Sequence, residues 1–150
     1  GLCYDKINKR LLLLCKEQSG IGKDHPKVKS IYAWDLETKS LSKAPVLDIN
    51  IQEVRGFCQR ELKVIPDHDF KPSGIAIHPF TGEYYVVSSR MRVLVVLSTE
   101  GKVEMVYHLP ESIFKQPEGI TFDEKGSLYI SNEGHDGPGN ILKFKYRAPK

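Results

Sequence analysis

The sequence predicts an all-β protein: a partial β-propeller of about three four-stranded blades, which together make half of a ring. Three observations predict this fold. A segment that begins at Gly74 is repeated at Gly119, and a spacing of 45 residues is typical of propeller blades. The opening of the chain, from Gly1, fits the same template. After each glycine come short apolar or alternating runs that are separated by turns, as expected of antiparallel strands.

The repeat also sets the expected blade boundaries. Residues 72–79 read Pro-Ser-Gly-Ile-Ala-Ile-His-Pro, and residues 117–123 read Pro-Glu-Gly-Ile-Thr-Phe-Asp. One partial propeller therefore spans 1–150, with blades near 1–50, 70–109 and 117–146. The strands expected in these blades lie at 1–5, 10–16, 30–36, 45–50, 74–78, 83–88, 92–98, 102–108, 119–123, 127–132 and 140–146.

Several single positions follow from this arrangement. A turn near Ile7 and Asn8 places Cys3 opposite Leu12 in the first two strands. Equivalent positions at the end of the first strand of each blade hold three polar residues that we expect to cap the next turn, namely Asp5, His78 and Asp123. The three cysteines, Cys3, Cys15 and Cys58, match no zinc pattern, and Cys3 and Cys15 are interpreted as small buried hydrophobic residues.

One segment interrupts the repeat. Ile51, Val54, Cys58 and Leu62 fall at i, i+3, i+7 and i+11, which predicts a helical insertion over 51–62. We expect this helix to pack over the rim of the propeller. A polar loop at 19–29 accounts for the rest of the extra length.

The third blade is expected to hold only three strands, so strand 140–146 should pair with a strand from outside residues 1–150. The missing N-terminal half of the propeller, or a second copy of the chain, would supply that strand. The same partner would cover an apolar face of the first blade made of residues such as Leu2, Leu12 and Trp34.

The composition excludes several classes of protein. Hydrophobic residues make up 40% of the chain and charged residues 27%, which is typical of a globular protein. A net charge of +3 is too small to indicate a nucleic-acid partner. No run approaches the roughly 18 apolar residues of a transmembrane helix. The chain has neither an initiator Met nor a signal peptide at its start, so we expect it to be a piece of a longer protein.

Residues 69–85, 117–123 and 128–134 resemble the SdiA-regulated family of bacterial β-propellers, which is related to the NHL-repeat and gluconolactonase-like propellers. The resemblance covers nearly the whole chain and is weakest at 19–29 and 51–68. It implies a six-bladed ring of which this chain is the C-terminal half. It also implies a location in the bacterial cell envelope, either periplasmic or membrane-anchored.

The candidate ligand site is the mouth of the central channel, where the first strand of each blade starts and the second strand ends. Its candidate residues are Ser73, Arg90, Glu118, Asn132 and Glu133. Further residues expected around the mouth are Cys15, Lys16, Glu17, Ser88, Ser89, His135 and Asp136. These are positions at which the repeat diverges, as a binding site on a repeating scaffold would.

Two interpretations of Glu118 remain open. Glu118 and Asn132, with Glu133 next to them, supply the oxygen ligands that Ca²⁺ takes, and related calcium-dependent lactonases use such ligands at this mouth. Alternatively, Glu118 forms an ion pair with Arg90 or Lys16 across the channel. No cofactor other than this possible Ca²⁺ is indicated, and no catalytic residue can be assigned.

Two functional hypotheses follow. The first is an envelope-associated propeller that binds a ligand or a protein at the channel mouth, with no catalysis evident. The second is a calcium-dependent hydrolase of the lactonase type, in which the metal acts as a Lewis acid. The absence of an ordered nucleophile motif favours the first.

Overall fold

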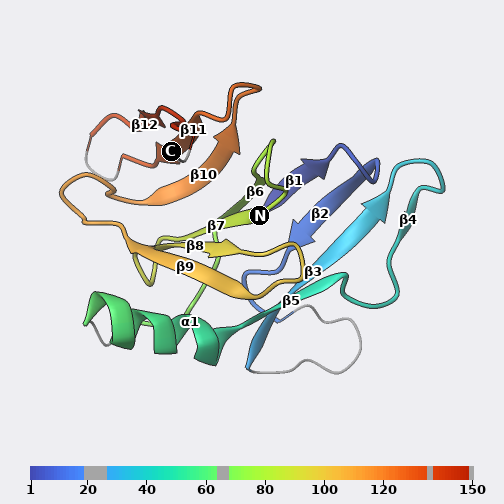
Figure 1. The fold of residues 1–150 in the computed structure, drawn as a ribbon, viewed down its shortest axis with the longest axis horizontal. Coiled ribbons are helices and arrows are strands. Elements are labelled where there is room, and N and C mark those ends of the chain that lie inside the picture. The colour runs from blue at the N-terminus through green and yellow to red at the C-terminus, as the bar shows by residue number, and fades with distance from the viewer. Residues whose placement is uncertain (19–26, 64–67, 135–136, 149–150) are drawn as a thin grey trace.

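The computed structural model describes residues 1–18, 27–63, 68–134 and 137–148. Three antiparallel sheets lie side by side, and one short helical segment runs beneath the middle sheet (Figure 1). Each sheet is one blade, so the all-β prediction of about three propeller blades is confirmed. The predicted strands all occur, with ends within two residues of those expected.

Blade 1 contains the N-terminal strands and a divided outer strand. Its first three strands are β1 (Leu2–Asp5), β2 (Arg10–Leu14) and β3 (Val28–Asp35). The outer strand consists of β4 (Ser40–Leu41), which the sequence did not predict, and β5 (Leu47–Asn50); both pair with β3. Cys3 pairs with Leu12, as the predicted turn requires.

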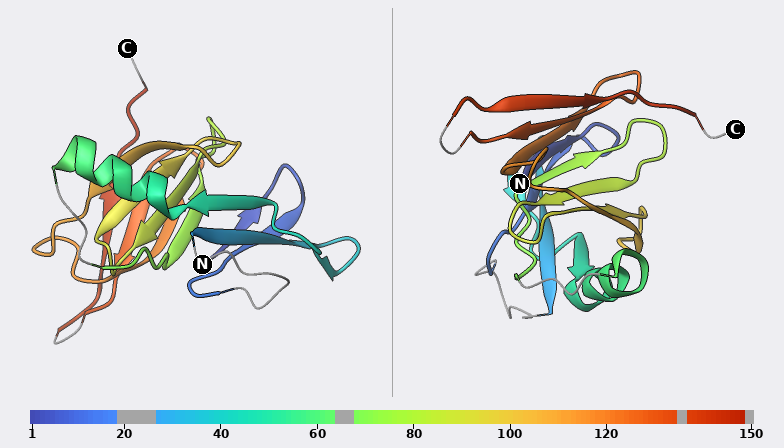
Figure 2. Two further views of the ribbon diagram at one scale, coloured as in Figure 1. Left: turned by 90° about the horizontal axis from the view of Figure 1, so that it is seen from below. Right: turned by 90° about the vertical axis from the view of Figure 1, so that its left-hand side faces the viewer.

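Blades 2 and 3 follow the expected strand order. Blade 2 contains β6 (Gly74–Ile77), β7 (Tyr84–Ser88), β8 (Val93–Leu97) and β9 (Val103–His108). Blade 3 contains β10 (Pro117–Phe122), β11 (Leu128–Asn132) and β12 (Asn140–Phe144). Within the described residues, β12 pairs with β11 alone, which leaves its other edge open. Figure 2 shows this sheet at the margin of the molecule.

The inner strands of neighbouring blades approach closely, which explains Gly74. A Cβ atom on Gly74 would lie 2.9 Å from the Glu118 carbonyl oxygen and 3.1 Å from Val87 Cγ2. Real Cβ contacts at such distances would force β6 and β10 apart. Gly74 therefore permits the inner strands of blades 2 and 3 to converge, whereas a Cβ on Gly119 would meet Ser131 of its own blade.

Apolar residues fill the two spaces between blades. Between blades 1 and 2, the core includes Leu12, Ile31, Ile75 and Val95, each at most 1% exposed. A second cluster around Val87, Leu94 and Ile130 joins blades 2 and 3. The prediction that Leu12 belongs to the outer face of blade 1 is wrong: because side chains alternate along a strand, Leu12 faces blade 2.

The outer face of blade 1 is nonetheless apolar. Leu2 is 62% exposed and Trp34 is 38% exposed. Strand pairing aligns Leu2 with Leu13, Tyr4 with Leu11, and Leu11 with Trp34, so these side chains share the face that points away from blade 2. These residues are neighbours on one face and so form a contiguous apolar patch, unlike the single hydrophobic residues that are scattered over most protein surfaces.

The predicted insertion is a helix whose last turn widens. It consists of α1 (Ile51–Phe57) and a π-helical turn, η1 (Cys58–Leu62). Asn50 caps α1, because its Oδ1 accepts hydrogen bonds from the backbone N–H groups of Gln52 and Glu53. Val54 and Cys58 are buried in the main core. The helix lies against β9 (Figure 1).

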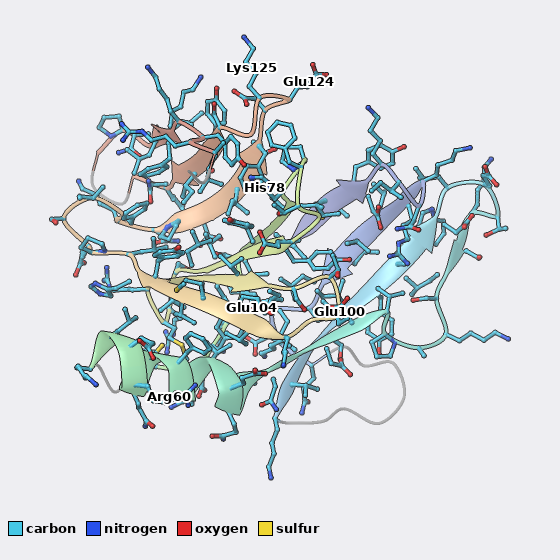
Figure 3. The ribbon with its side chains drawn as sticks, in the orientation of Figure 1. Arg60, His78, Glu100, Glu104, Glu124 and Lys125 are labelled. Atoms are coloured by element: carbon cyan, nitrogen blue, oxygen red, sulfur yellow. The ribbon has the colours of Figure 1, made fainter. Side chains whose placement is uncertain are left out.

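The three predicted turn-capping residues act as expected. Asp5 accepts hydrogen bonds from the backbone and side chain of Asn8, and Asp123 accepts from the N–H groups of Lys125 and Ser127. His78 Nδ1 accepts from the N–H groups of Phe80 and Thr81. Figure 3 shows His78 near the β6–β7 turn, where its ring contacts Phe122 of blade 3.

The cysteines match their interpretation as buried hydrophobic residues only in part. Cys58 is buried, whereas Cys3 and Cys15 are half-buried. Burial, and then the nearby Asp5, raise the pKa of Cys3 to about 12, so this thiol stays protonated and unreactive. Among the described residues, no helix is long and apolar enough to cross a membrane.

Replacing Asp5 by asparagine should weaken the protein at neutral pH. Burial acts to raise the pKa of Asp5, but hydrogen bonds from Asn8 and Arg10 outweigh it and hold that pKa below its ordinary value. The stabilisation is therefore present above about pH 4 and is lost as the pH falls through the lowered pKa. We expect Asp5→Asn to cost about 1–2 kcal/mol at pH 7.

Urea denaturation of both proteins at a series of pH values measures this effect. The difference between wild type and Asp5→Asn should shrink below pH ~4 and disappear below the lowered pKa of Asp5, where both side chains are uncharged. Glu124→Gln, at an exposed turn, is the matched control and should leave the curve unchanged. A difference that is equally large at acid pH would contradict the role assigned to the Asp5 charge.

Candidate functional site

A pocket of about 520 Å³ lies at the end of the blades where β2 and β7 finish and β10 begins. We call it the mouth pocket. It is lined by five cationic side chains, which are Lys16, Lys71, Arg90, Arg92 and Lys115. Its other lining residues are Glu17, His68, Ser89, Gln116 and Glu118. All three blades thus contribute, because equivalent strand ends point in the same direction.

Glu118 is held in the wall of the mouth pocket by neutral groups. It follows Pro117 at an irregularity in the pairing of β10 with β11. Its Oε1 accepts hydrogen bonds from Ser89 Oγ and Gln116 Nε2, each at 3.3 Å. The ion pair with Arg90 or Lys16 that the sequence left open is not formed. Glu118 therefore contributes a half-buried negative charge to a pocket that is otherwise mostly cationic.

Ser73 and Glu133 lie beside the mouth pocket but do not line it. Ser73 Oγ donates a hydrogen bond of 2.7 Å to the Pro117 carbonyl, so it joins blade 2 to blade 3. Glu133 Oε2 accepts a hydrogen bond of 2.8 Å from Gln116 Nε2, which also bonds Glu118. Gln116 thus connects the two carboxylates that the sequence singled out.

Asn132 turns away from the other predicted site residues. It is 6% exposed, and its Nδ2 donates to Asn140 Oδ1 at 2.9 Å, across β11 and β12. It lies on the same side of β11 as Ile130, which packs against blade 2. Its Oδ1 is buried without a hydrogen-bond partner among the described residues.

These residues do not fit a calcium site. Ca²⁺ takes six to eight oxygen ligands, several of them carboxylates. Asn132 bonds Asn140 and does not line the mouth pocket, whereas Glu118 shares that pocket with five cationic side chains. In the described part of the chain, no three His, Cys, Asp or Glu side chains are grouped to hold a metal ion. We derive no reaction step through a metal from this chain.

Two of the five cations are already paired. Lys71 Nζ lies 2.6 Å from Glu17 Oε1, and Arg92 Nη2 lies 3.0 Å from Glu111 Oε1. The hydrogen bond from Lys71 lowers the pKa of Glu17 below its ordinary value. Both carboxylates are largely exposed, so solvent weakens their pairing.

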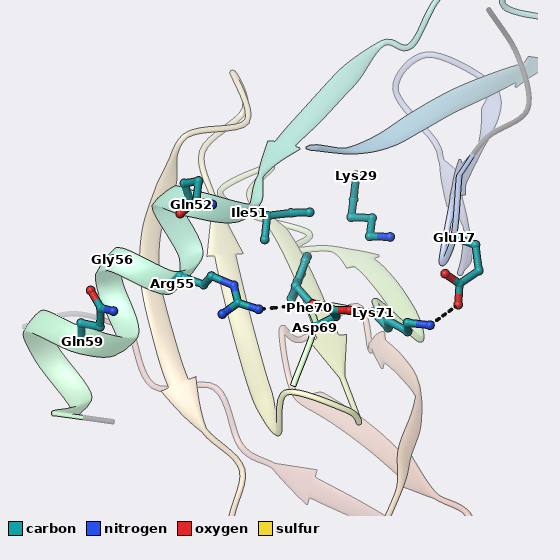
Figure 4. A pocket seen from close by; sticks show the side chains of 10 residues that line it. All are labelled: Glu17, Lys29, Ile51, Gln52, Arg55, Gly56, Gln59, Asp69, Phe70 and Lys71. Atoms are coloured by element: carbon teal, nitrogen blue, oxygen red, sulfur yellow. Dashed lines mark hydrogen bonds and ion pairs between the residues drawn. The ribbon is translucent and has the colours of Figure 1, made fainter. Parts of the chain in front are cut away.

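A second pocket adjoins the mouth pocket at the Lys71–Glu17 ion pair. It has a volume of about 560 Å³ and lies between α1, blade 1 and the segment that leads into β6 (Figure 4). Arg55 reaches across it to Asp69, with Nη2 3.4 Å from Oδ1. The helical insertion therefore forms one wall of a groove that continues into the mouth pocket.

The inner strands line a third cavity, whose lining side chains are mostly apolar. It has a volume of about 450 Å³ and is bordered by β1, β6 and β10. Its wall includes Leu2, Ile75 and Ile120. This surface corresponds to the inner wall of the predicted channel, and it lacks the charged groups of the mouth pocket.

Sequence reasoning missed half of the mouth pocket. It did not select Lys71, Arg92, Lys115, Gln116 or His68. A signal for two of them was present, because Lys71 and Gln116 both directly precede the proline of the repeat. Ser88, which was expected at the mouth, is fully buried and bonds the Lys71 carbonyl instead. His135 and Asp136 lie outside the described residues.

The comparisons with known proteins agree with the fold. The family model described as SdiA-regulated matches residues 1–136. No curated protein sequence matches the chain.

Solved structures resemble the chain at low sequence identity. A gluconolactonase from Xanthomonas campestris is 13% identical, with a TM-score of 0.53, over 96% of this chain and 42% of its own. A luciferin-regenerating enzyme is 16% identical, with a TM-score of 0.54, over 97% of this chain and 44% of its own. A chain of a nidogen/laminin complex is 19% identical, with a TM-score of 0.54, over 95% of this chain and 42% of its own. The chain thus spans less than half the length of these structures, and the likeness concerns the fold.

Proposed function

Because the chain belongs to the SdiA-regulated family, we propose that it is part of an envelope-associated propeller that binds a ligand or a protein at the mouth pocket, without catalysis. The observation that carries this proposal is the convergence of strand ends from three blades on one pocket. Its volume of about 520 Å³ is in the range of small-molecule sites. The envelope location rests on the family resemblance.

The arrangement of side chains favours binding over catalysis. The groups that hydrogen-bond Glu118 are the amide of Gln116 and the hydroxyl of Ser89, which hold the carboxylate in the wall of the pocket. The likeness to the gluconolactonase and the luciferin-regenerating enzyme is at low sequence identity, so it supports the fold and not an activity. A calcium-dependent hydrolase would require Ca²⁺ to bind beside Glu118, which the experiment with CaCl₂ tests.

We further propose that other propeller blades cover the two open ends of the chain. The open edge of β12 and the apolar outer face of blade 1 are the surfaces such blades would contact. The remaining part of the ring, or a second copy of the chain, is the proposed partner. Six blades is the number that the family resemblance implies.

Melting the protein with a panel of small molecules tests the binding proposal. The panel should contain neutral, anionic and cationic compounds, and Ca²⁺, added as CaCl₂, should be one of the cations. A ligand of the folded protein raises the melting temperature by mass action. We expect at least one compound to do so, and Ser89→Trp, which fills the mouth pocket, should abolish the shift.

Thr99→Trp is the matched control, since Thr99 is exposed at the β8–β9 turn and lines none of the three pockets. It should leave the shift intact. A panel without any compound that Ser89→Trp blocks would contradict the proposed function. A shift by calcium that Glu118→Gln removes would instead favour the hydrolase.

A further inference from the structure

We propose that the ligand of the mouth pocket is a small anion with more than one negative charge, a polycarboxylate or a phosphorylated compound. This inference rests on the proposed binding function and names its ligand class. Five cationic and two acidic side chains line the pocket. The lining therefore carries an excess of three positive charges, which Glu111, paired with Arg92, reduces to two.

Three of these cations have no acidic partner. Within the described part of the chain, no carboxylate pairs with Lys16, Arg90 or Lys115. They come from the end of β2, the end of β7 and the segment before β10, so each belongs to a different blade. Because all three line one pocket, a single ligand there can contact each of them. Charges that only keep a surface solvated have no reason to converge in this way.

Arg92 gives a second, independent indication. Its Nη2 pairs with Glu111, but its Nη1 is buried and has no hydrogen-bond partner among the described residues. A buried N–H donor without an acceptor is costly, and such donors are uncommon in folded proteins. A rotation of the Arg92 side chain into the mouth pocket, which it already lines, would let an anion there supply the missing acceptor.

The types of side chain match the chemistry of oxyanions. Arg90 and Arg92 carry guanidinium groups, whose planar donors fit carboxylate and phosphate oxygens two at a time. Lys16 and Lys115 act as point charges at the rim. Glu118, Ser89 and Gln116 form a polar wall that can bond the uncharged hydroxyl groups of such a compound.

A small anion fits better than a nucleic acid. The basic residues surround a pocket of about 520 Å³ and do not form an extended stripe along the surface. The chain's net charge of +3 is too low for the many phosphate contacts of a duplex.

Equilibrium dialysis of the 150-residue chain against radiolabelled citrate or inorganic phosphate tests the inference, and the method tolerates self-association of the protein. We expect saturable binding of one or both, weakened as NaCl is raised. The citrate and phosphate arms distinguish a carboxylate ligand from a phosphorylated one. Arg90→Gln combined with Lys115→Gln should weaken binding by about tenfold or more.

Lys125→Gln is the matched control, because Lys125 is an exposed lysine at a turn far from the pocket (Figure 3). It should leave the affinity unchanged. Absence of binding to both anions, or equal binding by the double variant, would overturn the inference. If an uncharged compound binds and Ser89→Trp blocks it, the proposed function survives without the anion. If nothing binds at the mouth pocket, both proposals fail.

Discussion

Replacing Phe70 by alanine should lower the free energy of unfolding by about 3–5 kcal/mol, as expected for deleting a buried phenyl ring. Phe70 is 1% exposed and packs in the core cluster shared by blades 1 and 2 and the helix. It lies in the segment that leads into β6, so its ring fixes this segment beneath α1 (Figure 4). Urea denaturation at fixed protein concentration measures the loss.

Phe80→Ala is the matched control. Phe80 is 58% exposed, and its ring contacts only the rings of His78 and Tyr146 among the described aromatic residues. Its removal should cost less than about 1.5 kcal/mol. Should Phe70→Ala not fold, Phe70→Leu provides an intermediate case that keeps most of the volume. Equal losses at Phe70 and Phe80 would contradict the core assignment.

The 150-residue chain prepared by itself should associate or bind a hydrophobic dye. Leu2 and Trp34 are exposed on the outer face of blade 1, and β12 has an open edge within the described sheets. Burial of a Leu-sized side chain is worth roughly 1.5–3 kcal/mol, so covering several of these residues provides a strong driving force. An unpaired strand edge adds a template for pairing.

Sedimentation and dye fluorescence measure this behaviour. Leu2→Glu together with Trp34→Glu should reduce both association and dye binding, because charge on this face opposes its burial. Ile7→Glu is the control, since Ile7 is 87% exposed at a turn away from the sheet face. A stable 17.0 kDa monomer that binds no dye would show that these surfaces need no partner.

The sequence pattern predicted the position of the helical insertion but not its detailed geometry. The spacing of Ile51, Val54, Cys58 and Leu62 predicted a helix, and α1 with η1 occupies that range. The widening to a π-helical turn at Cys58 was not predicted, because apolar spacing does not distinguish hydrogen bonds to the fourth residue from those to the fifth.

In the candidate site, too, the sequence pattern predicted some features and not others. Arg90 and Glu118 were selected from their places in the repeat, and both line the mouth pocket. Asn132 was selected by the same reasoning, yet its side chain pairs with Asn140. A repeat locates the end of a strand, whereas the side of the sheet that a residue occupies depends on pairing and on bulges such as the one at Pro117.

The sequence by itself determined the propeller fold, the strand order, the capped turns and the glycine that begins each blade. Local patterns carry this information, because strand alternation and turn chemistry act between residues that are near in the chain. Only the tertiary structure decided that Leu12 faces blade 2, that Gln116 joins Glu118 to Glu133, and that five cations share one pocket. Those contacts join residues from different blades, and their distances depend on how neighbouring sheets pack.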